Sequence, residues 1–258
     1  MTRKSLSYTV AICFLAVAMG VEASGATVFF DDFSDGSATN NTPLDRNGSP
    51  VIWTPLAGFN QGTGVASSGD YVLTTTSDDG AFASLTSHMP LSDTSVRAQM
   101  RLLNGTAAIA VFARADMAAL TAYQAGINTV TGNAYIVRNT PTPIPLIVKP
   151  AGVDVMSGDV AIQFDAIGET LRLFVWNPGT PKPTQPFIEI QDGTLGTGVT
   201  GVLLDSGGGS GSGVFRFVHV ADASIPEPQT ALLFAFGMAS LVARQRTRAK
   251  RTSEARLD

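Results

Sequence analysis

The sequence predicts an all-β protein, an antiparallel β-sandwich carried between two targeting segments. Short runs of β-branched or alternating residues recur along the middle of the chain and are separated by Gly, Asn, Asp and Pro. This spacing is typical of a sandwich, and no long amphipathic helix competes with it, although 116–122 could form a turn or two. The expected strands are 27–30, 51–53, 71–75, 81–85, 95–103, 107–113, 123–128, 134–138, 146–149, 160–166, 170–176, 187–190, 201–204 and 214–220.

Two segments predict how the sheets are built. In 95–103, four apolar residues alternate with Ser, Arg and Gln, which indicates one buried face and one wet face. In 160–176, two alternating runs flank Gly168 and Glu169, which predicts a hairpin with its turn at these two residues. Both patterns favour antiparallel sheets.

The amino-terminal segment 1–23 reads as a secretory signal. Arg3 and Lys4 precede an apolar stretch at 10–19, and small residues follow. We expect signal peptidase to cleave after Ala23, with cleavage after Ala26 or an uncleaved anchor helix as alternatives. The only cysteine, Cys13, lies in this segment, so the exported product would have no disulfide and no thiol nucleophile.

The carboxyl-terminal segment contains an uncharged apolar run, QTALLFAFGMASLVA at 229–243, which favours a helix. About 15 residues at 1.5 Å each give roughly 22 Å, a short but tolerable membrane span. A buried amphipathic helix is the alternative. The basic residues that follow indicate a cytoplasmic tail and an external body; they are Arg244, Arg246, Arg248, Lys250 and Arg251.

Pro226, Glu227 and Pro228 precede this helix, and motif, helix and basic tail together resemble the PEP-CTERM sorting signal of exported bacterial proteins. The resemblance covers residues 225–251. It implies an exosortase partner, processing near the motif, transient anchoring at the inner membrane and a final place at the cell surface or in the extracellular matrix. The polar residues 252–258 make the tail longer than such tails usually are.

The body, 27–223, resembles the concanavalin A-like lectin and glucanase jelly roll. The residues that carry this resemblance are FFDDFSDG at 29–36, SVRAQMRLL at 95–103, AAIAVFAR at 107–114, AIQFDAIGETLRLFVWN at 161–177 and GVFRFVHVAD at 213–222. The resemblance implies that the first and last strands lie together, which would bring Asp31 and Asp32 near Asp222. A fold alone does not fix a function.

Charge argues against a nucleic-acid partner. Between residues 27 and 225 the chain has nine basic and seventeen acidic residues, a net charge of −8. Binding to phosphates requires a basic face, which this body lacks.

Catalytic groups are scarce. Glycoside hydrolysis requires two carboxylates about 5 to 9 Å apart, but the only glutamates of the body are Glu169, in the expected turn, and Glu189, alone in a strand. We therefore expect no enzyme and no required cofactor, with a carbohydrate-active hydrolase on the same fold as the alternative. Calcium is the one metal considered, at Asp31, Asp32 and Asp222, because hard cations prefer oxygen ligands; solvated turns are the alternative.

Sugar binding would use aromatic platforms with amides around them. The aromatic candidates are Trp53, Tyr123, Tyr135 and Trp176, with Asn128, Asn133 and Asn139 in the neighbouring loops. Core packing is the alternative for the tryptophans. The sequence therefore predicts an exported, non-catalytic β-sandwich that contacts exopolysaccharide, with a purely structural or adhesion component as a further alternative.

Overall fold

The structure is a computed structural model that describes residues 25–40, 42–76, 80–105, 107–206 and 210–226. In these residues the regular elements are all strands. They are β1 (Gly25–Asp31), β2 (Trp53–Asn60), β3 (Gly62–Ser67), β4 (Asp70–Thr75), β5 (Ala81–Thr86), β6 (Thr94–Asn104), β7 (Ala108–Asp116), β8 (Thr121–Asn128), β9 (Asn133–Asn139), β10 (Ile144–Pro150), β11 (Val160–Ile167), β12 (Thr170–Trp176), β13 (Ile188–Gln191), β14 (Val199–Asp205) and β15 (Ser212–Pro226).

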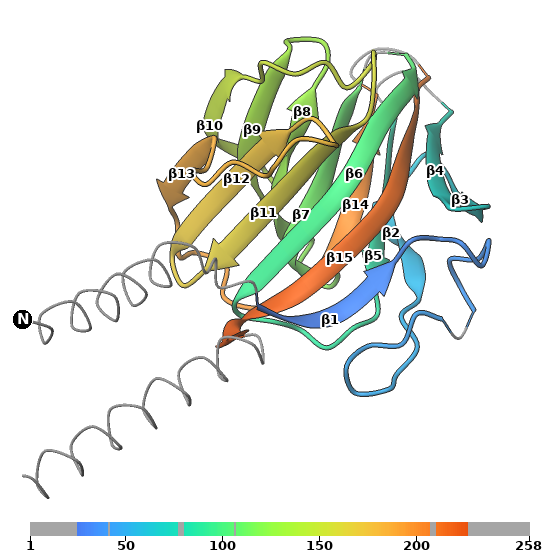
Figure 1. Ribbon diagram of the computed structural model, residues 1–258, viewed down its shortest axis with the longest axis vertical. Helices are drawn as coiled ribbons and strands as arrows, with labels where there is room; N and C mark the ends of the chain where they lie inside the picture. The colour runs from blue at the N-terminus through green and yellow to red at the C-terminus, as the bar shows by residue number, and fades with distance from the viewer. Residues whose placement is uncertain (1–24, 41, 77–79, 106, 207–209, 227–258) are drawn as a thin grey trace, which may run out of the picture. The chain divides into compact units, whose positions relative to one another are not determined.

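The strands form two antiparallel sheets that face each other (Figure 1). One sheet has eight strands in the order β13-β12-β11-β6-β15-β4-β3, with β1 beside β15. The other has seven strands in the order β10-β9-β8-β7-β14-β5-β2. Both sheets belong to one compact unit, Thr27–Ser224. The prediction of an antiparallel β-sandwich is confirmed, as is the prediction that the first and last strands lie together.

The main core fills the space between the sheets. Along β6, every second side chain is buried, from Val96 to Leu102, while Arg97 on the other face is exposed. Residues of β7 that face inward, such as Ile109 and Val111, belong to the same apolar cluster. The alternation in the sequence therefore marks the inner face of each sheet, because successive strand residues point to opposite sides.

The predicted hairpin is confirmed by the pairing of β11 with β12. Ile167 pairs with Thr170, so Gly168 and Glu169 form a two-residue turn. Gly168 has φ +55°, a left-handed conformation that glycine adopts without steric cost.

One strand lies outside the sequence prediction, and another is longer than expected. β3 has the composition Gly, Thr, Gly, Val, Ala, Ser, which is poor in strand-forming residues, and it pairs only with β4 at the edge of its sheet. β2 begins at Trp53, where the predicted run 51–53 ends. Segment 117–120 is a turn between β7 and β8, held by hydrogen bonds from the amides of Ala118 and Ala119 to Asp116.

The predicted targeting segments are almost wholly outside the described residues. The signal segment 1–23, Glu227, Pro228, the helix at 229–243 and the basic tail lie there. Within the part of the chain that the structure describes, no helix is long and apolar enough to cross a membrane. The export and sorting predictions therefore stay predictions.

Candidate functional site

A cleft of about 360 Å³ opens on the outer face of the seven-stranded sheet. Its residues come mainly from β8, β9, β10 and β14, with one side chain, Phe59, reaching over from β2. The lining residues are Phe59, Ala108, Gln124, Asn128, Thr131, Asn133, Tyr135, Val137, Asn139, Pro143, Pro145, Val148, Leu203 and Asp205. This volume is at the lower end of the range of about 300–1,000 Å³ that is typical of ligand sites.

On this face of the sheet, two small residues of β7 and β8 lie between Leu203 and Tyr135. Across the strands, Leu203 pairs with Ala110, Ala110 with Gly126, and Gly126 with Tyr135. A Cβ atom at Gly126 would lie 2.2 Å from the Ile109 carbonyl oxygen, so a larger residue does not fit there. Glycine at this position thus allows the backbones of β7 and β8 to approach closely.

Three polar side chains form a hydrogen-bonded chain along the cleft. The Asn139 Nδ2 donates to Gln124 Oε1 at 2.7 Å, and the Gln124 Nε2 donates to the Tyr135 hydroxyl at 2.5 Å. Burial raises the pKa of Tyr135, so the phenol stays protonated at physiological pH. Since Tyr135 accepts from Gln124, its own hydroxyl proton remains available for an acceptor in the cleft.

The rim of the cleft is polar but nearly neutral. Asn128 and Asn133 face each other across the turn between β8 and β9, and both line the cleft. Asp205 is the one carboxylate among the lining residues that the structure describes. The cleft therefore offers amide donors and acceptors beside an apolar floor, which suits a neutral, hydroxyl-rich ligand.

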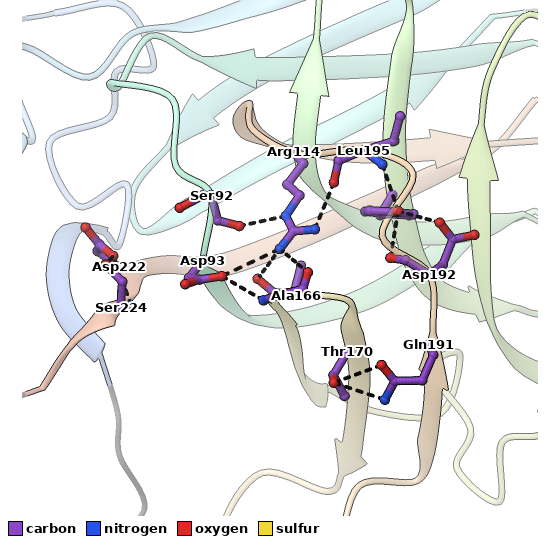
Figure 2. Close-up of polar contacts among 12 residues, drawn as sticks. Ser92, Asp93, Arg114, Ala166, Thr170, Gln191, Asp192, Leu195, Asp222 and Ser224 are labelled. Atoms are coloured by element: carbon purple, nitrogen blue, oxygen red, sulfur yellow. Dashed lines mark hydrogen bonds and ion pairs between the residues drawn. The ribbon is translucent and has the colours of Figure 1, made fainter.

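A second polar cluster closes one end of the sandwich around Arg114 (Figure 2). The guanidinium is 3% exposed and donates to four backbone carbonyls, those of Ser92, Leu195, Ala166 and Gly168. It also lies 3.7 Å from the Asp93 carboxylate. Arg114 has φ +52°, an unfavourable backbone conformation that these bonds hold in place. Its contacts are made with the protein itself, which assigns it a structural role.

Asp192 extends this cluster toward β8 and β9. It accepts hydrogen bonds from the Tyr123 hydroxyl at 2.6 Å, from the Thr194 amide at 2.9 Å, and from Arg138. Burial acts to raise the pKa of Asp192, but the bonds from Tyr123 and Thr194 and the Arg138 charge outweigh it, and the pKa is lowered. The Tyr123 hydroxyl also accepts from the Leu195 amide.

The structure separates the four aromatic residues proposed for sugar contact. Tyr135 lines the cleft. Trp53 and Tyr123 are 2% and 0% exposed and lie in the main core, so neither presents a ring to solvent. Trp176 lies on the outer face of the other sheet, where the Arg97 guanidinium covers it at 5.3 Å from the ring centre. For Trp53 the core alternative is therefore the correct one.

The proposed calcium ligands are not brought together. Thr27 of β1 contacts His219 at 3.0 Å, and Phe30 contacts Phe217, so β1 runs antiparallel to β15 and carries Asp31 and Asp32 away from Asp222. The expectation that these carboxylates lie near one another was wrong, because the two strands pair in opposite directions.

Each of these carboxylates also has its own partners. Asp31 accepts from the Trp53 indole at 2.8 Å and from the Phe33 amide, and burial raises its pKa. Asp222 pairs with Arg46 at 2.7 Å and accepts from Ser224 beside it (Figure 2). Within the described residues, no three His, Cys, Asp or Glu side chains gather as metal ligands would. Asp31, Asp32 and Asp222, as the structure places them, do not form a calcium site.

Gln124 and Phe59 are cleft residues that the sequence did not single out. Gln124 lies in a run of otherwise apolar or small strand residues, and a buried polar residue in such a run is the signal that could have indicated it. Phe59 gave no signal, because its place depends on how β2 leaves the sheet. The three asparagines proposed around a sugar, Asn128, Asn133 and Asn139, all line the cleft.

Comparison with known proteins identifies the fold. No family model matches the chain, and no curated protein matches it by sequence. Among solved structures, the exoplasmic/lumenal domain of VIP36, bound to Ca²⁺ and Man2, has a TM-score of 0.54 and 12% identity, covering 75% of this chain and 89% of that one.

Two bacterial structures are similar to the same extent. The carbohydrate-binding module CBM66 from Bacillus subtilis has a TM-score of 0.50 and 18% identity, covering 63% of this chain and 91% of that one. A protein of unknown function with a galectin-like fold, also from Bacillus subtilis, has a TM-score of 0.51 and 10% identity, covering 77% and 97%. The body has a lectin-like jelly-roll fold. At these identities the likeness establishes the fold alone.

Proposed function

We propose that the described domain is a non-catalytic module that binds a neutral polysaccharide in the cleft of the seven-stranded sheet. The observation that carries this proposal is the chain of Asn139, Gln124 and Tyr135 in a cleft that is also lined by apolar residues such as Val137, Val148 and Leu203. Amides and a phenol can match sugar hydroxyls, and the apolar floor suits the C–H faces of a sugar ring. The lectin-like fold supports the same reading by analogy.

A hydrolase on the same fold is the weaker proposal. Glycoside hydrolysis uses two carboxylates across the scissile bond, and among the described lining residues the cleft contains only Asp205. Glu169 lies in the β11–β12 turn, and Glu189 pairs with Arg172 on the eight-stranded sheet. Release of reducing sugar from a bound polysaccharide would favour the hydrolase.

A glycan array tests the binding proposal. We expect the protein to retain neutral glycans, and Asn133→Ala to weaken retention because Asn133 lines the cleft. Asn47→Ala is the matched control, since Asn47 lies in an exposed turn and does not line the cleft. Absence of binding to any glycan would instead favour a structural or adhesion component without a ligand.

The ends of the chain support a proposal about its destination. The protein would be exported across the inner membrane, cleaved by signal peptidase after Ala23, held by the helix at 229–243 and processed by an exosortase at Pro226, Glu227 and Pro228. Its final place would be the cell surface or an exopolysaccharide matrix. Replacing Pro226 and Glu227 with Ala should leave an unprocessed precursor at the inner membrane; unchanged processing in a cell fraction and mass-spectrometry assay would refute this.

A further inference from the structure

Strand β2 has an irregular segment at 56–59, which we call the arch. Pro55 pairs with Ser84 and Asn60 pairs with Phe82, so the residues 56–59 stand opposite the single residue Ala83. Gly58 in this segment has φ +87°, a conformation that L side chains rarely adopt. The surplus residues therefore form an extended bulge within the strand.

The arch packs over the outer face of the sheet. Leu56 is 8% exposed and belongs to the apolar cluster of that face, which includes Leu85 and Phe112. Phe59 packs against the same cluster and is half-buried. Leu56 and Phe59, which belong to an edge strand, thus cover part of the outer face of the sheet.

Phe59 and Asn139 divide this face into two hollows. Both residues line the cleft of about 360 Å³, and both also line a second hollow next to Leu56 and Phe112. The second hollow has a volume of about 10 Å³, which is about enough for one water molecule. Asn139 is held in this position by its bond to Gln124. This second hollow, as lined by the described residues, has no space for a sugar ring.

We infer that the cleft binds the end of a polysaccharide chain rather than an internal segment, with Phe59 and Asn139 as the residues that stop the chain. The inference rests on the proposed function and adds the form of the ligand. An internal segment must leave a site at both ends, whereas among the described residues Phe59 and Asn139 separate the cleft from a hollow of only about 10 Å³. Each polymer molecule would then bind the protein at its terminus, whatever its length.

Binding stoichiometry tests the inference. The whole chain, in a zwitterionic detergent that contains no sugar, is titrated with linear glucan, mannan and fructan oligosaccharides and with their parent polymers. We expect one bound protein per polymer chain at every polymer length. Capping one terminus of the oligosaccharides should abolish binding, and this second measurement needs no protein variant.

The Phe59→Ala substitution should let the polysaccharide chain extend past this position, because it joins the two hollows. We expect its stoichiometry to rise with polymer length, while Phe30→Ala should match the wild type. Phe30 is the matched control because it is 49% exposed and lies on β1 of the other sheet.

The outcomes separate the two proposals. Absence of binding to every probe would overturn the proposed function and this inference together. Stoichiometry that rises with length in the wild type would overturn the inference alone, as would binding that is abolished by capping neither terminus. A folded Phe59→Ala variant that keeps one protein per chain would overturn the role of Phe59.

Discussion

Tyr123 and Gln124 are neighbours in β8, and they serve two polar networks on opposite faces of one sheet. Tyr123 points inward and joins the closed network, which we define as Arg114, Tyr123, Arg138, Asp192 and Thr194. Gln124 points outward and joins the open network, Asn139, Gln124 and Tyr135. Adjacent strand residues point to opposite faces, so one step along the chain separates the two networks.

The two networks differ in charge and in the partners of their hydrogen-bonding groups. The closed network contains two guanidiniums and a carboxylate, and most of its donors go to backbone carbonyls, Asp192 and Thr194, while the Arg138 Nε is buried without a hydrogen-bond partner. The open network is neutral and lies in a cleft, and its Tyr135 hydroxyl accepts a hydrogen bond from Gln124. Charges paired within the protein hold loops together, whereas neutral groups beside a cleft can exchange hydrogen bonds with a ligand.

The largest effect should come from Arg114→Ala, which breaks the closed network. It leaves four backbone carbonyls without their donor, and removing one member of a buried charged cluster costs about 3–5 kcal/mol. We expect the melting temperature, measured by calorimetry, to fall by roughly 10 °C.

Arg172→Ala is the control for Arg114→Ala. Arg172 pairs with Glu189 on the surface, and exposed pairs contribute about 0–1 kcal/mol. A similar loss in both variants would contradict the structural role of the closed network.

Gln124→Ala should act on binding more than on stability, because it interrupts the open network. Loss of one or two hydrogen bonds in the cleft should weaken glycan affinity about tenfold, measured by calorimetric titration with the best ligand from the array. The free energy of unfolding should change by about 1 kcal/mol or less.

Gln163→Ala is the matched control for Gln124→Ala, since Gln163 bonds to Asp165 on the other sheet. Equal affinity in Gln124→Ala and the wild type would contradict the assignment of the cleft.

Low pH should affect the stability that the closed network contributes more than that of the open network. The pKa of Asp192 is lowered in the fold, so its charged form stabilises the folded state above the unfolded value of about 3.9, and this stability is lost as pH falls through the folded pKa. Asp192→Asn does not titrate there. Its melting temperature should therefore fall less steeply below about pH 4 than that of the wild type.

The open network contains no carboxylate, so Gln124→Ala should keep the wild-type acid slope. An unchanged slope in Asp192→Asn would show that Asp192 does not contribute to acid sensitivity.

The smallest effect should come from the removal of metal ions by chelation, which tests whether either network depends on a metal. The described residues contain no cluster suited to a metal ion, and Asp222 is already paired with Arg46. We expect neither EDTA nor added calcium to shift the melting temperature. A clear rise with calcium would contradict this reading.

The fold was largely predictable from the sequence, whereas the cleft was predictable only in part. Alternation in 95–103 and the hairpin turn at Gly168 are local patterns, and local patterns survive into the structure. Tyr135 and the three asparagines were named for their chemistry, but the same argument also named Trp53 and Tyr123, which are buried. Chemistry alone does not tell which aromatic residue faces solvent.

The sequence by itself determined the β-sandwich and the acidic body, because strand periodicity and charge depend only on the order of residues, and it also predicts targeting segments at the two ends. Tertiary structure decided which polar residues meet. Gln124 reaches Tyr135 through the pairing of β8 with β9, and Phe59 reaches the cleft through an irregular register of β2. Register and strand direction are set by packing between distant segments, which also explains why Asp31 and Asp222 do not meet.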